Sequence, residues 1–309
     1  MVDPVTAEAD PAVVGAHEFG FRDNRSRRVV EPMRTDCLAP RRMGVFTRTK
    51  PARTTMRRLA FAATVALLGL SPARAAEPLH VYGPGGPLLA MREAAAAFGR
   101  AHGVEVRVTA GPTPQWLAQA KQDADLVFSG SEAMMSDFIA AMPEQIDPAT
   151  ATPLYLRPSA ILVRPGNPGH IAGVRDLFRP GHRILVVNGA GQQGLWEDVA
   201  GRLGDIGSVK AFRANIARVA RNSAEARQAW TEDATLDAWL IWSIWQVANP
   251  SLAEQVAVEP EYRIHRDTGI ALTRRGEGRP EAAQFARFLA SPDGARIFAR
   301  WGWTVPDAR

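Results

Sequence analysis

The chain has almost no cysteine, and this absence removes several kinds of chemistry. Cys37 is the only cysteine among 309 residues, and residues 76–309, which hold all eight tryptophans, contain none. A disulfide framework, a Cys-ligated metal site and a Cys nucleophile are therefore excluded from that part of the chain. No cysteine follows the apolar run at residues 59–70, so lipid anchoring through a cysteine after that run is excluded as well.

The chain also lacks an apolar run long enough to cross a membrane. The longest candidate lies in MRRLAFAATVALLGLSPARA, from Met56 onward, where the apolar stretch Leu59 to Leu70 has about 12 residues against the roughly 20 that a span requires. Two arginines precede this stretch and Ala73-Arg74-Ala75 follows it. The pattern predicts a cleaved signal peptide over 56–75 and a soluble periplasmic protein from residue 76 on, with Sec or Tat export left open.

The residues before this segment show no pattern of a folded domain. Residues 1–55 are rich in arginine, carry several prolines and have neither helical nor alternating apolar periodicity. We expect them to be disordered. Met56 stands where an initiator would, so the hypothesis is that translation begins there.

Residues 76–309, the predicted mature chain, carry no excess of basic charge. The first 75 residues hold 13 of the 37 Lys and Arg and 7 of the 32 Asp and Glu, which leaves 24 basic and 25 acidic residues in 76–309. A nucleic-acid partner is therefore not expected. These 234 residues are enough for one large domain or two lobes.

Strand and helix patterns alternate along the mature chain. Short apolar strands are predicted over Leu79–Tyr82, Val104–Thr109, Asp125–Phe128 and Arg183–Val187, each followed by a helical pattern, and the chain closes with helices over 280–301 broken at Ser291-Pro292. Extended stretches near 159–164 and 262–272 are candidates for crossings between two lobes. The alternation predicts an α/β fold with a largely parallel sheet, whose ligand crevice lies at the carboxyl ends of the strands.

Three turns of one kind follow predicted strands. They span Gly83–Gly86, Ser129–Ser131 and Asn188–Gly194, and each joins a strand to a helix start through small residues with exposed amides or hydroxyls. Such turns admit a ligand close to the backbone and present the positive end of a helix dipole. Together they predict an anion site built without a positively charged side chain, although small residues also simply make tight turns.

Catalytic and cofactor patterns are weak. Gly189–Gly194 matches GxGxxG, but the acid expected about 20 residues later is missing apart from Asp205, so no nucleotide cofactor is predicted. The mature histidines have no metal-binding spacing, and no metal site is predicted. A serine hydrolase using Ser129 or Ser131 stays an alternative, although position 133 is Ala where a nucleophile elbow needs glycine.

Three tryptophans recur at a spacing of three. Trp239, Trp242 and Trp245 would share one stripe on a helix, and such a stripe is usually packed in the core. In the alternative interpretation, Trp242 and Ser243 face the crevice and supply an apolar wall and a hydroxyl.

Longer motifs resemble a known family. The segments LHVYGPGGPLLAMREAAAAFGRAHG, TAGPTPQW, DLVFSGSE, LYLRPSAILVRPGNP, ILVVNGAGQQGLWED, LDAWLIWSIWQVANP and FLASPDGARIFARWGW lie in order over 79–303. They resemble the accessory colonization factor AcfC family, a branch of the bacterial extracellular solute-binding proteins related to molybdate- and sulfate-binding components.

The resemblance implies a type II periplasmic-binding-protein fold of two α/β lobes joined by two crossover strands. It implies lobe I over 76–160 plus 263–309 and lobe II over 161–262. By position the resemblance implies a ligand-binding role for eight residues, and the tryptophan pattern adds Trp242 and Ser243 to them. The implied set is Gly85, Gly86, Ser129, Ser131, Ser159, Gln192, Gln193 and Trp196.

The function implied is that of a binding protein without enzymatic activity or cofactor. Its ligand would be a small anion, an oxyanion such as sulfate or molybdate or else an organic acid or sulfonate, held by a monomer. The expected partners are the membrane subunits of an ABC importer or a methyl-accepting chemoreceptor. An adhesion or signalling module without a small ligand is the remaining alternative.

Overall fold

The computed structural model describes residues 77–305, apart from the side chain of Ala190. These residues belong to one compact unit. The predicted disorder of 1–55, the start at Met56 and the signal peptide over 56–75 lie outside the described residues and stay predictions.

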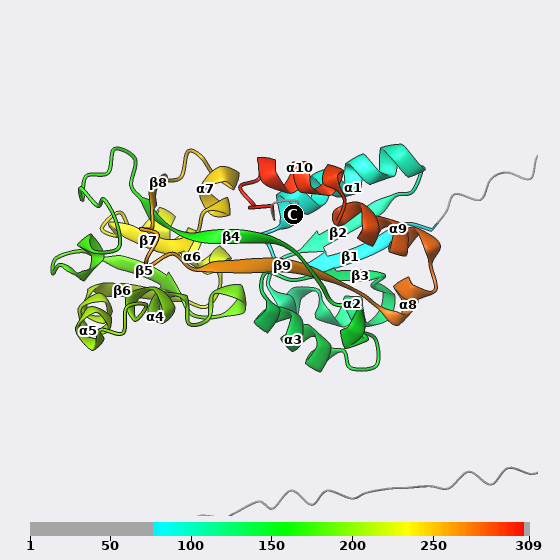
Figure 1. Ribbon diagram of the computed structural model, residues 1–309, viewed down its shortest axis with the longest axis horizontal. Helices are drawn as coiled ribbons and strands as arrows, with labels where there is room; N and C mark the ends of the chain where they lie inside the picture. Colours follow the sequence, from blue (N-terminus) through cyan, green and yellow to red (C-terminus); the bar gives the residue numbers. More distant parts are fainter. Residues whose placement is uncertain (1–76, 306–309) are drawn as a thin grey trace, which may run out of the picture. The chain divides into compact units, whose positions relative to one another are not determined.

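Nine strands pair side by side within the described residues, in the order β2-β1-β3-β9-β4-β7-β5-β6, with β8 also paired to β4 (Figure 1). Their bounds are β1 Leu79–Gly83, β2 Val106–Ala110, β3 Leu126–Phe128, β4 Thr152–Val163, β5 Ile184–Val187, β6 Ile216–Ala220, β7 Ala238–Trp242, β8 Glu254–Ala257 and β9 His265–Leu272.

Ten α-helices and four short 3₁₀ turns connect these strands in the same part of the chain. The helices are α1 Leu88–His102, α2 Leu117–Asp123, α3 Glu132–Ala141, α4 Leu195–Ala200, α5 Ile206–Asn215, α6 Ser223–Glu232, α7 Ile244–Ala248, α8 Arg274–Glu277, α9 Pro280–Leu289 and α10 Pro292–Arg300. The 3₁₀ turns are η1 Thr113–Gln115, η2 Pro148–Thr150, η3 Asp176–Phe178 and η4 Ala190–Gln192.

The strands form two lobes that share β4. In the first lobe, β1 pairs in parallel with β2 and β3, and β9 runs antiparallel to β3 and to residues 152–158 of β4. In the second lobe, residues 159–163 of β4 run antiparallel to β7 and β8, and β5 pairs in parallel with β6 and β7. Helices α1–α3 and α8–α10 pack on the first lobe and α4–α7 on the second (Figure 1).

The crossing between the lobes is braced by backbone and hydroxyl hydrogen bonds. The amide of Ser159 donates to the carbonyl of Ile264 at 2.8 Å, and the Ser159 Oγ accepts from the amide of Ile264 at 3.1 Å. β4 therefore passes from one lobe to the other beside the start of β9. The predicted lobe boundaries at 160/161 and 262/263 fall close to this brace and stay predictions.

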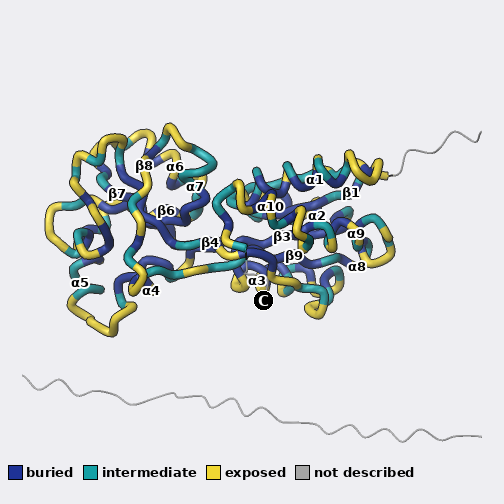
Figure 2. The backbone as a smooth tube through the Cα atoms, turned by 45° about the horizontal axis from the view of Figure 1, so that its top comes forward, coloured by how far each residue is buried: buried dark blue, intermediate teal, exposed yellow. Residues whose placement is uncertain are grey.

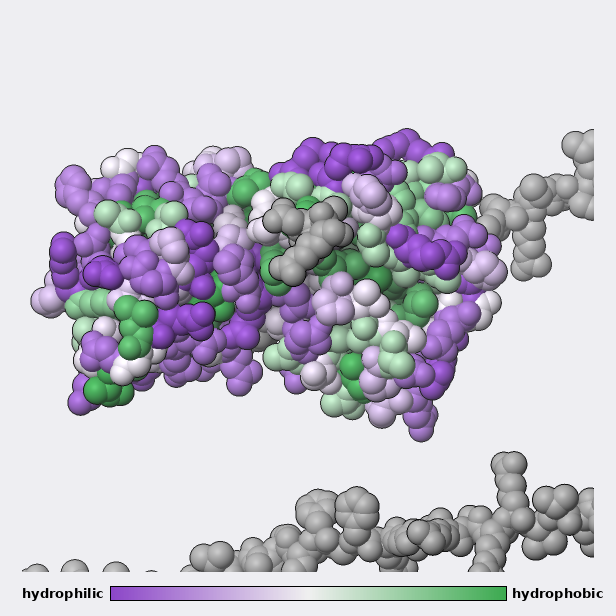
Figure 3. All heavy atoms as spheres, viewed as in Figure 1, coloured by the Kyte–Doolittle hydropathy of each residue, from purple (hydrophilic) through white to green (hydrophobic). Residues whose placement is uncertain are grey.

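The core follows from the hydrophobic composition of the central strands. Every residue of β3, β5 and β7 is buried, as expected for strands covered on both faces, while the edge strand β6 is largely exposed. Figure 2 shows the buried strands inside each lobe with exposed loops around them. The face seen in Figure 3 is mostly hydrophilic, and its apolar atoms lie in small separate areas.

Trp239 and Trp242 are buried in the core as expected, but the three tryptophans do not share a helical stripe. Residues 238–242 form strand β7, and the helix begins only at Ile244. Because side chains alternate along a strand, a spacing of three places Trp239 and Trp242 on opposite faces. Trp239 packs against Trp230 of α6 with ring centroids 6.2 Å apart. Trp242 lies on the opposite face of β7.

Candidate functional site

A cavity of about 110 Å³ lies where the two lobes meet. The first lobe lines it with residues of the segments that follow β1, β2 and β3, including Thr113 of η1 and Met134 of α3. The other first-lobe lining residues are Pro84, Gly85, Gly86, Pro87, Gly111, Pro112 and Gly130. The second lobe lines it from β7, α7, the segment after β5 and the start of α6, with Gly191, Gln192, Asn222, Ser223, Ala224, Trp242 and Trp245. Arg157 of the shared strand β4 completes the lining.

Arg157 is the charged group of this cavity. Its side chain is 3% exposed, and its guanidinium donates a hydrogen bond from Nη2 to the carbonyl of Gly130. The guanidinium carbon lies 4.8 Å from the ring centroid of Trp242 and 5.1 Å from that of Trp303. Such contacts hold the flat guanidinium in place while its other N–H groups remain available.

Three glycines lie next to the guanidinium of Arg157, and it fits there because they have no side chains. A Cβ atom built on Gly86, Gly130 or Gly191 would lie 3.1–3.2 Å from a guanidinium nitrogen of Arg157. A Cβ on Gly191 would also lie 2.9 Å from the carbonyl oxygen of Gly130, so the loops of the two lobes touch here. The small residues of these turns are thus explained by close packing around one cation as well as by tight turns.

The electrostatics of the cavity favour an anion. Burial lowers the pKa of the Arg157 guanidinium to about 9, with the nearby Arg266 acting in the same direction and Asp267 opposing it, so the group is still charged at neutral pH. Among the described residues that line the cavity there is no Asp or Glu. The N-terminal ends of α1 and α6 border it and add the positive ends of two helix dipoles.

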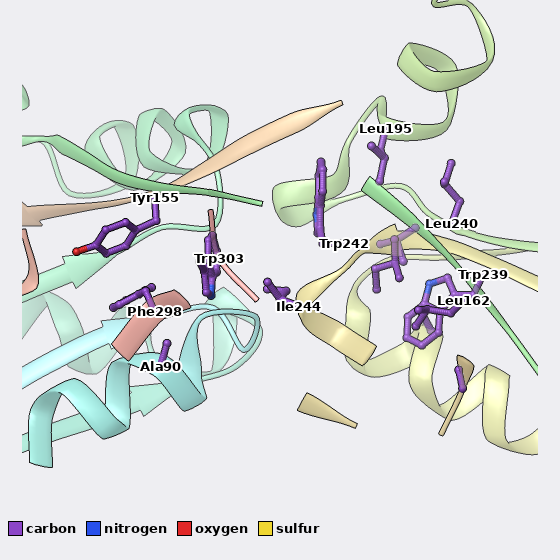
Figure 4. Packing of buried hydrophobic residues seen from close by; sticks show 14 of the residues in the cluster. Ala90, Tyr155, Leu162, Leu195, Trp239, Leu240, Trp242, Ile244, Phe298 and Trp303 are labelled. Carbon is purple, nitrogen blue, oxygen red and sulfur yellow. The ribbon is translucent and has the colours of Figure 1, made fainter. Parts of the chain in front are cut away.

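The second-lobe wall combines aromatic rings with an amide and a hydroxyl. Nε2 of Gln192 donates to Oγ of Ser223 at 2.5 Å, and Asn222 caps α6 by accepting from the amide of Glu225. Figure 4 shows Trp242 at the edge of the second-lobe core and Trp303 at the edge of the first-lobe core, on facing sides, with Ile244 between them. The cavity is thus lined by the cation of Arg157, by a polar loop and by aromatic rings.

Four of the ten predicted ligand residues line the cavity. These are Gly85, Gly86, Gln192 and Trp242. Their contact with a ligand stays a prediction, because the cavity shows only where they lie.

The other six lie elsewhere. Oγ of Ser129 accepts from the amide of Gly269, Oγ of Ser131 caps α3 by accepting from the amide of Met134, and Oγ of Ser159 braces the crossing. The side chain of Trp196 stacks on Phe212, Gln193 is exposed, and Ser243 is buried next to Trp242. Since the hydroxyls of Ser129 and Ser131 serve the backbone and do not line the cavity, their placement does not favour the hydrolase alternative.

The expectation of a cavity without a charged side chain is wrong, because Arg157 lies in it. The sequence carries one signal of this residue, a lone arginine inside the apolar strand LYLRPSAILV. A charge at an inward position of such a strand indicates either a buried pair or a ligand. The carbonyl of Gly130 and the rings of Trp242 and Trp303 are too distant in sequence for the motif to reveal them.

Comparisons with known proteins agree with the fold. The profile of the bacterial extracellular solute-binding protein family matches residues 79–304. The crystal structure of L-phospholactate-bound PEB3 is 33% identical with a TM-score of 0.69, and the alignment covers 73% of this chain and 99% of that one. Peb3 from Campylobacter jejuni gives 32% identity and a TM-score of 0.68 with the same coverage.

A more distant structure shares the fold alone. The sulfate-binding protein SubI from Mycobacterium tuberculosis H37Rv is 17% identical with a TM-score of 0.62, over 75% of this chain and 88% of that one. No curated protein matches the sequence. Within residues 77–305, no helix has both the length and the apolar character of a membrane span.

The family match spans both lobes and every loop that lines the cavity, and the predicted fold class is confirmed as that of type II periplasmic binding proteins. The chain belongs to the bacterial extracellular solute-binding protein family.

Proposed function

We propose that this protein captures a small oxyanion or phosphorylated organic acid between its lobes in the periplasm and delivers it to an ABC importer. The observation that carries the proposal is the buried guanidinium of Arg157 in a cavity lined by no acidic side chain. A buried charge is costly unless it is paired, and here a ligand would supply the opposite charge.

The geometry around Arg157 suits oxygen atoms of an anion. Nη2 is occupied by the carbonyl of Gly130, whereas Nε is buried without a hydrogen-bond partner. Trp242 and Trp303 lie near the guanidinium and restrict its movement. Charge-assisted hydrogen bonds from a fixed guanidinium to carboxylate or phosphate oxygens are among the strongest in proteins.

The relative with bound L-phospholactate supports this ligand class. At 33% identity over nearly the whole of PEB3, the same fold holds a small molecule that carries a phosphate and a carboxylate. A cavity of about 110 Å³ is large enough for several waters or one compact anion of this kind.

The finer assignments belong to the same proposal. We place the protein in the AcfC branch of the family, as a periplasmic monomer that is secreted through a cleaved signal peptide and has no enzymatic activity. Closure of the lobes would strengthen each contact with the ligand by removing water, and the closed form would be recognised by the importer, or by a chemoreceptor. The family match supports the general role of solute binding.

The test substitution removes the positive charge of Arg157 and keeps a long side chain in its place. In Arg157→Met we expect the affinity for the best anion of a panel to fall about 30-fold or more, since the charged partner of the ligand is lost. The panel is L-phospholactate, phosphate, sulfate, molybdate and L-lactate, measured by calorimetry in an anion-poor buffer. The melting temperature of the unliganded variant should stay close to that of the wild type, because removing the cost of an unpaired buried charge offsets the lost hydrogen bond to the carbonyl of Gly130.

Arg164→Met is the matched control. Arg164 also stacks on a tryptophan, with its guanidinium carbon 3.8 Å from the ring centroid of Trp230, and it donates to the carbonyls of Asp233 and Leu236 away from the cavity. It should lose stability and keep anion affinity. A panel in which no anion binds the wild-type protein, or undiminished binding by Arg157→Met, would refute the proposal.

A further inference from the structure

Three polar side-chain atoms of residues that line the cavity are buried without a hydrogen-bond partner. They are Nε of Arg157, Nε1 of Trp242 and Oε1 of Gln192, and all three residues line the cavity. The first two are donors, which suit the oxygens of an anion. The third is an acceptor, and an anion that has only acceptor oxygens cannot satisfy it.

The orientation of Gln192 follows from its partner. Nε2 of Gln192 donates to Oγ of Ser223 at 2.5 Å, and the Gln192 side chain is 3% exposed, so Oε1 is the end of the amide left over. The hydroxyl of Ser223 accepts this bond and keeps its own hydrogen. The pair thus offers one acceptor and one donor side by side, the complement of a hydroxyl group, which both donates and accepts.

We propose that the ligand is an oxyanion that carries a hydroxyl hydrogen, donated to Oε1 of Gln192. This inference rests on the proposed function, because it assumes that an anion occupies the cavity. The chemical class is a protonated oxyanion, such as hydrogen phosphate, or a hydroxyl-bearing organic anion. Gln192 is then the residue that determines specificity, and Arg157 supplies the charge.

The physical reason is the cost of an unsatisfied buried acceptor. An oxyanion without hydrogen would place its lone pairs against those of Gln192 Oε1, an atom that is buried from solvent. Sites that hydrogen-bond a ligand hydroxyl reject analogues lacking it strongly, because the buried partner is then left alone. Sulfate and molybdate carry no hydrogen at neutral pH, so they should bind less tightly than a hydrogen-bearing anion of equal charge and shape.

Hydrogen phosphate and sulfate form the matched pair of probes. Both are tetrahedral dianions at slightly alkaline pH, and only hydrogen phosphate carries a hydrogen. Calorimetry on the wild-type protein should show a preference for phosphate of about tenfold or more. In Gln192→Leu the preference should fall to within about twofold, because no acceptor is left to satisfy.

The neighbouring residue supplies the control. Gln193 is exposed and does not line the cavity, so Gln193→Leu makes the same substitution one position away and should keep the phosphate preference. The comparison in the wild-type protein needs no variant, so the absence of a phosphate preference overturns the inference even if Gln192→Leu does not fold.

The outcomes separate the two proposals. Equal binding of phosphate and sulfate by the wild-type protein overturns the inference and leaves the proposed function standing. A preference for sulfate also overturns it. A phosphate preference that survives in Gln192→Leu assigns the selectivity to another residue. If neither these two anions nor any other of the panel binds, the proposed function fails and the inference with it.

Discussion

At the scale of single residues, Asp125 shows how a buried charge is satisfied inside the protein. Its side chain is fully buried and accepts from the amide of His80 at 2.8 Å, from Nε of Arg275 at 3.0 Å and from Nη1 of Arg279 at 2.7 Å. This carboxylate ties β1 to α8 and to the start of α9. The buried charge of Asp125 is therefore balanced by protein side chains, whereas the proposed partner of the buried charge of Arg157 is a ligand.

We predict that Asp125→Asn lowers the free energy of unfolding by about 3 kcal/mol, because it leaves two arginines without their common partner. Urea denaturation measures this loss. The anion affinity should be unchanged, since Asp125 does not line the cavity.

Asp123→Asn is the control for this change. Asp123 is partly exposed and accepts from the hydroxyl of Tyr82, so its loss should cost about 1 kcal/mol. Equal losses in the two variants would show that the buried arginine contacts of Asp125 add nothing.

Residue roles were the least predictable part of the site. The turns that carry Gly85, Gly86 and Gln192 were identified by small residues after strands, which is a local signal, and they do line the cavity. Ser129 and Ser131 have the same local signal, yet their hydroxyls serve Gly269 and the cap of α3. Local sequence shows which groups are available, and only the fold decides whether a hydroxyl faces the backbone or the cavity.

At the scale of elements, the closing helix α10 connects stability to the site. Glu93 of α1 accepts from the guanidinium of Arg300 and from Nε1 of Trp301 at 2.7 Å. Just beyond, Thr304 bridges to Leu156 of β4, and Trp303 lies near Arg157. The docking of α10 on α1 therefore helps to hold the ring that packs beside the buried guanidinium.

The ion pair at this junction makes stability depend on pH. The hydrogen bond from Arg300 is the main cause that lowers the pKa of Glu93 below its ordinary value of 4.5. Burial, the next largest effect, opposes it, and the hydrogen bond from Trp301 lowers the pKa further. The stabilisation is therefore complete above pH 4.5 and is lost as the pH falls through the lowered pKa.

We predict that Glu93→Gln lowers the free energy of unfolding at neutral pH by about 1 kcal/mol or less, since the pair is partly exposed to solvent. Its stability should approach that of the wild type in acid, where Glu93 is protonated. Urea denaturation at neutral and acid pH measures this, with Glu144→Gln, at an exposed position, as a control that should show no change. A deficit of Glu93→Gln that persists undiminished in acid would contradict the assignment.

Elements were predictable where composition and length agree. The strands near 79–82, 125–128 and 183–187 and the helices of 280–301 were placed within a few residues. The tryptophan segment was not, because β7 is apolar on both faces and shows no alternation that would distinguish it from a helix. Its pairing with β4 and β5, which decides the matter, joins residues about 50 to 80 positions apart in sequence.

At the scale of the whole unit, loops of the two lobes approach each other closely at Gly191 and Gly130. Gly191 follows β5 in the second lobe, and Gly130 follows β3 in the first. A Cβ atom on Gly191 would lie 2.9 Å from the carbonyl oxygen of Gly130 and 3.1 Å from Nη2 of Arg157. Gly191 has an ordinary φ of −72°, so an alanine there meets an obstacle only across the lobes and none in its own backbone.

We predict that Gly191→Ala weakens anion binding about tenfold, because the added methyl group holds the loops of the two lobes apart and admits water between Arg157 and its ligand. The melting temperature of the unliganded protein should stay close to that of the wild type, since each lobe keeps its own core. Gly85→Ala is the control, because Gly85 also lines the cavity but a Cβ atom there meets no atom within 4 Å. Calorimetry with phosphate should therefore separate the two alanine variants. If both bind phosphate as the wild type does, the contact between Gly191 and Gly130 has no part in closing the cavity.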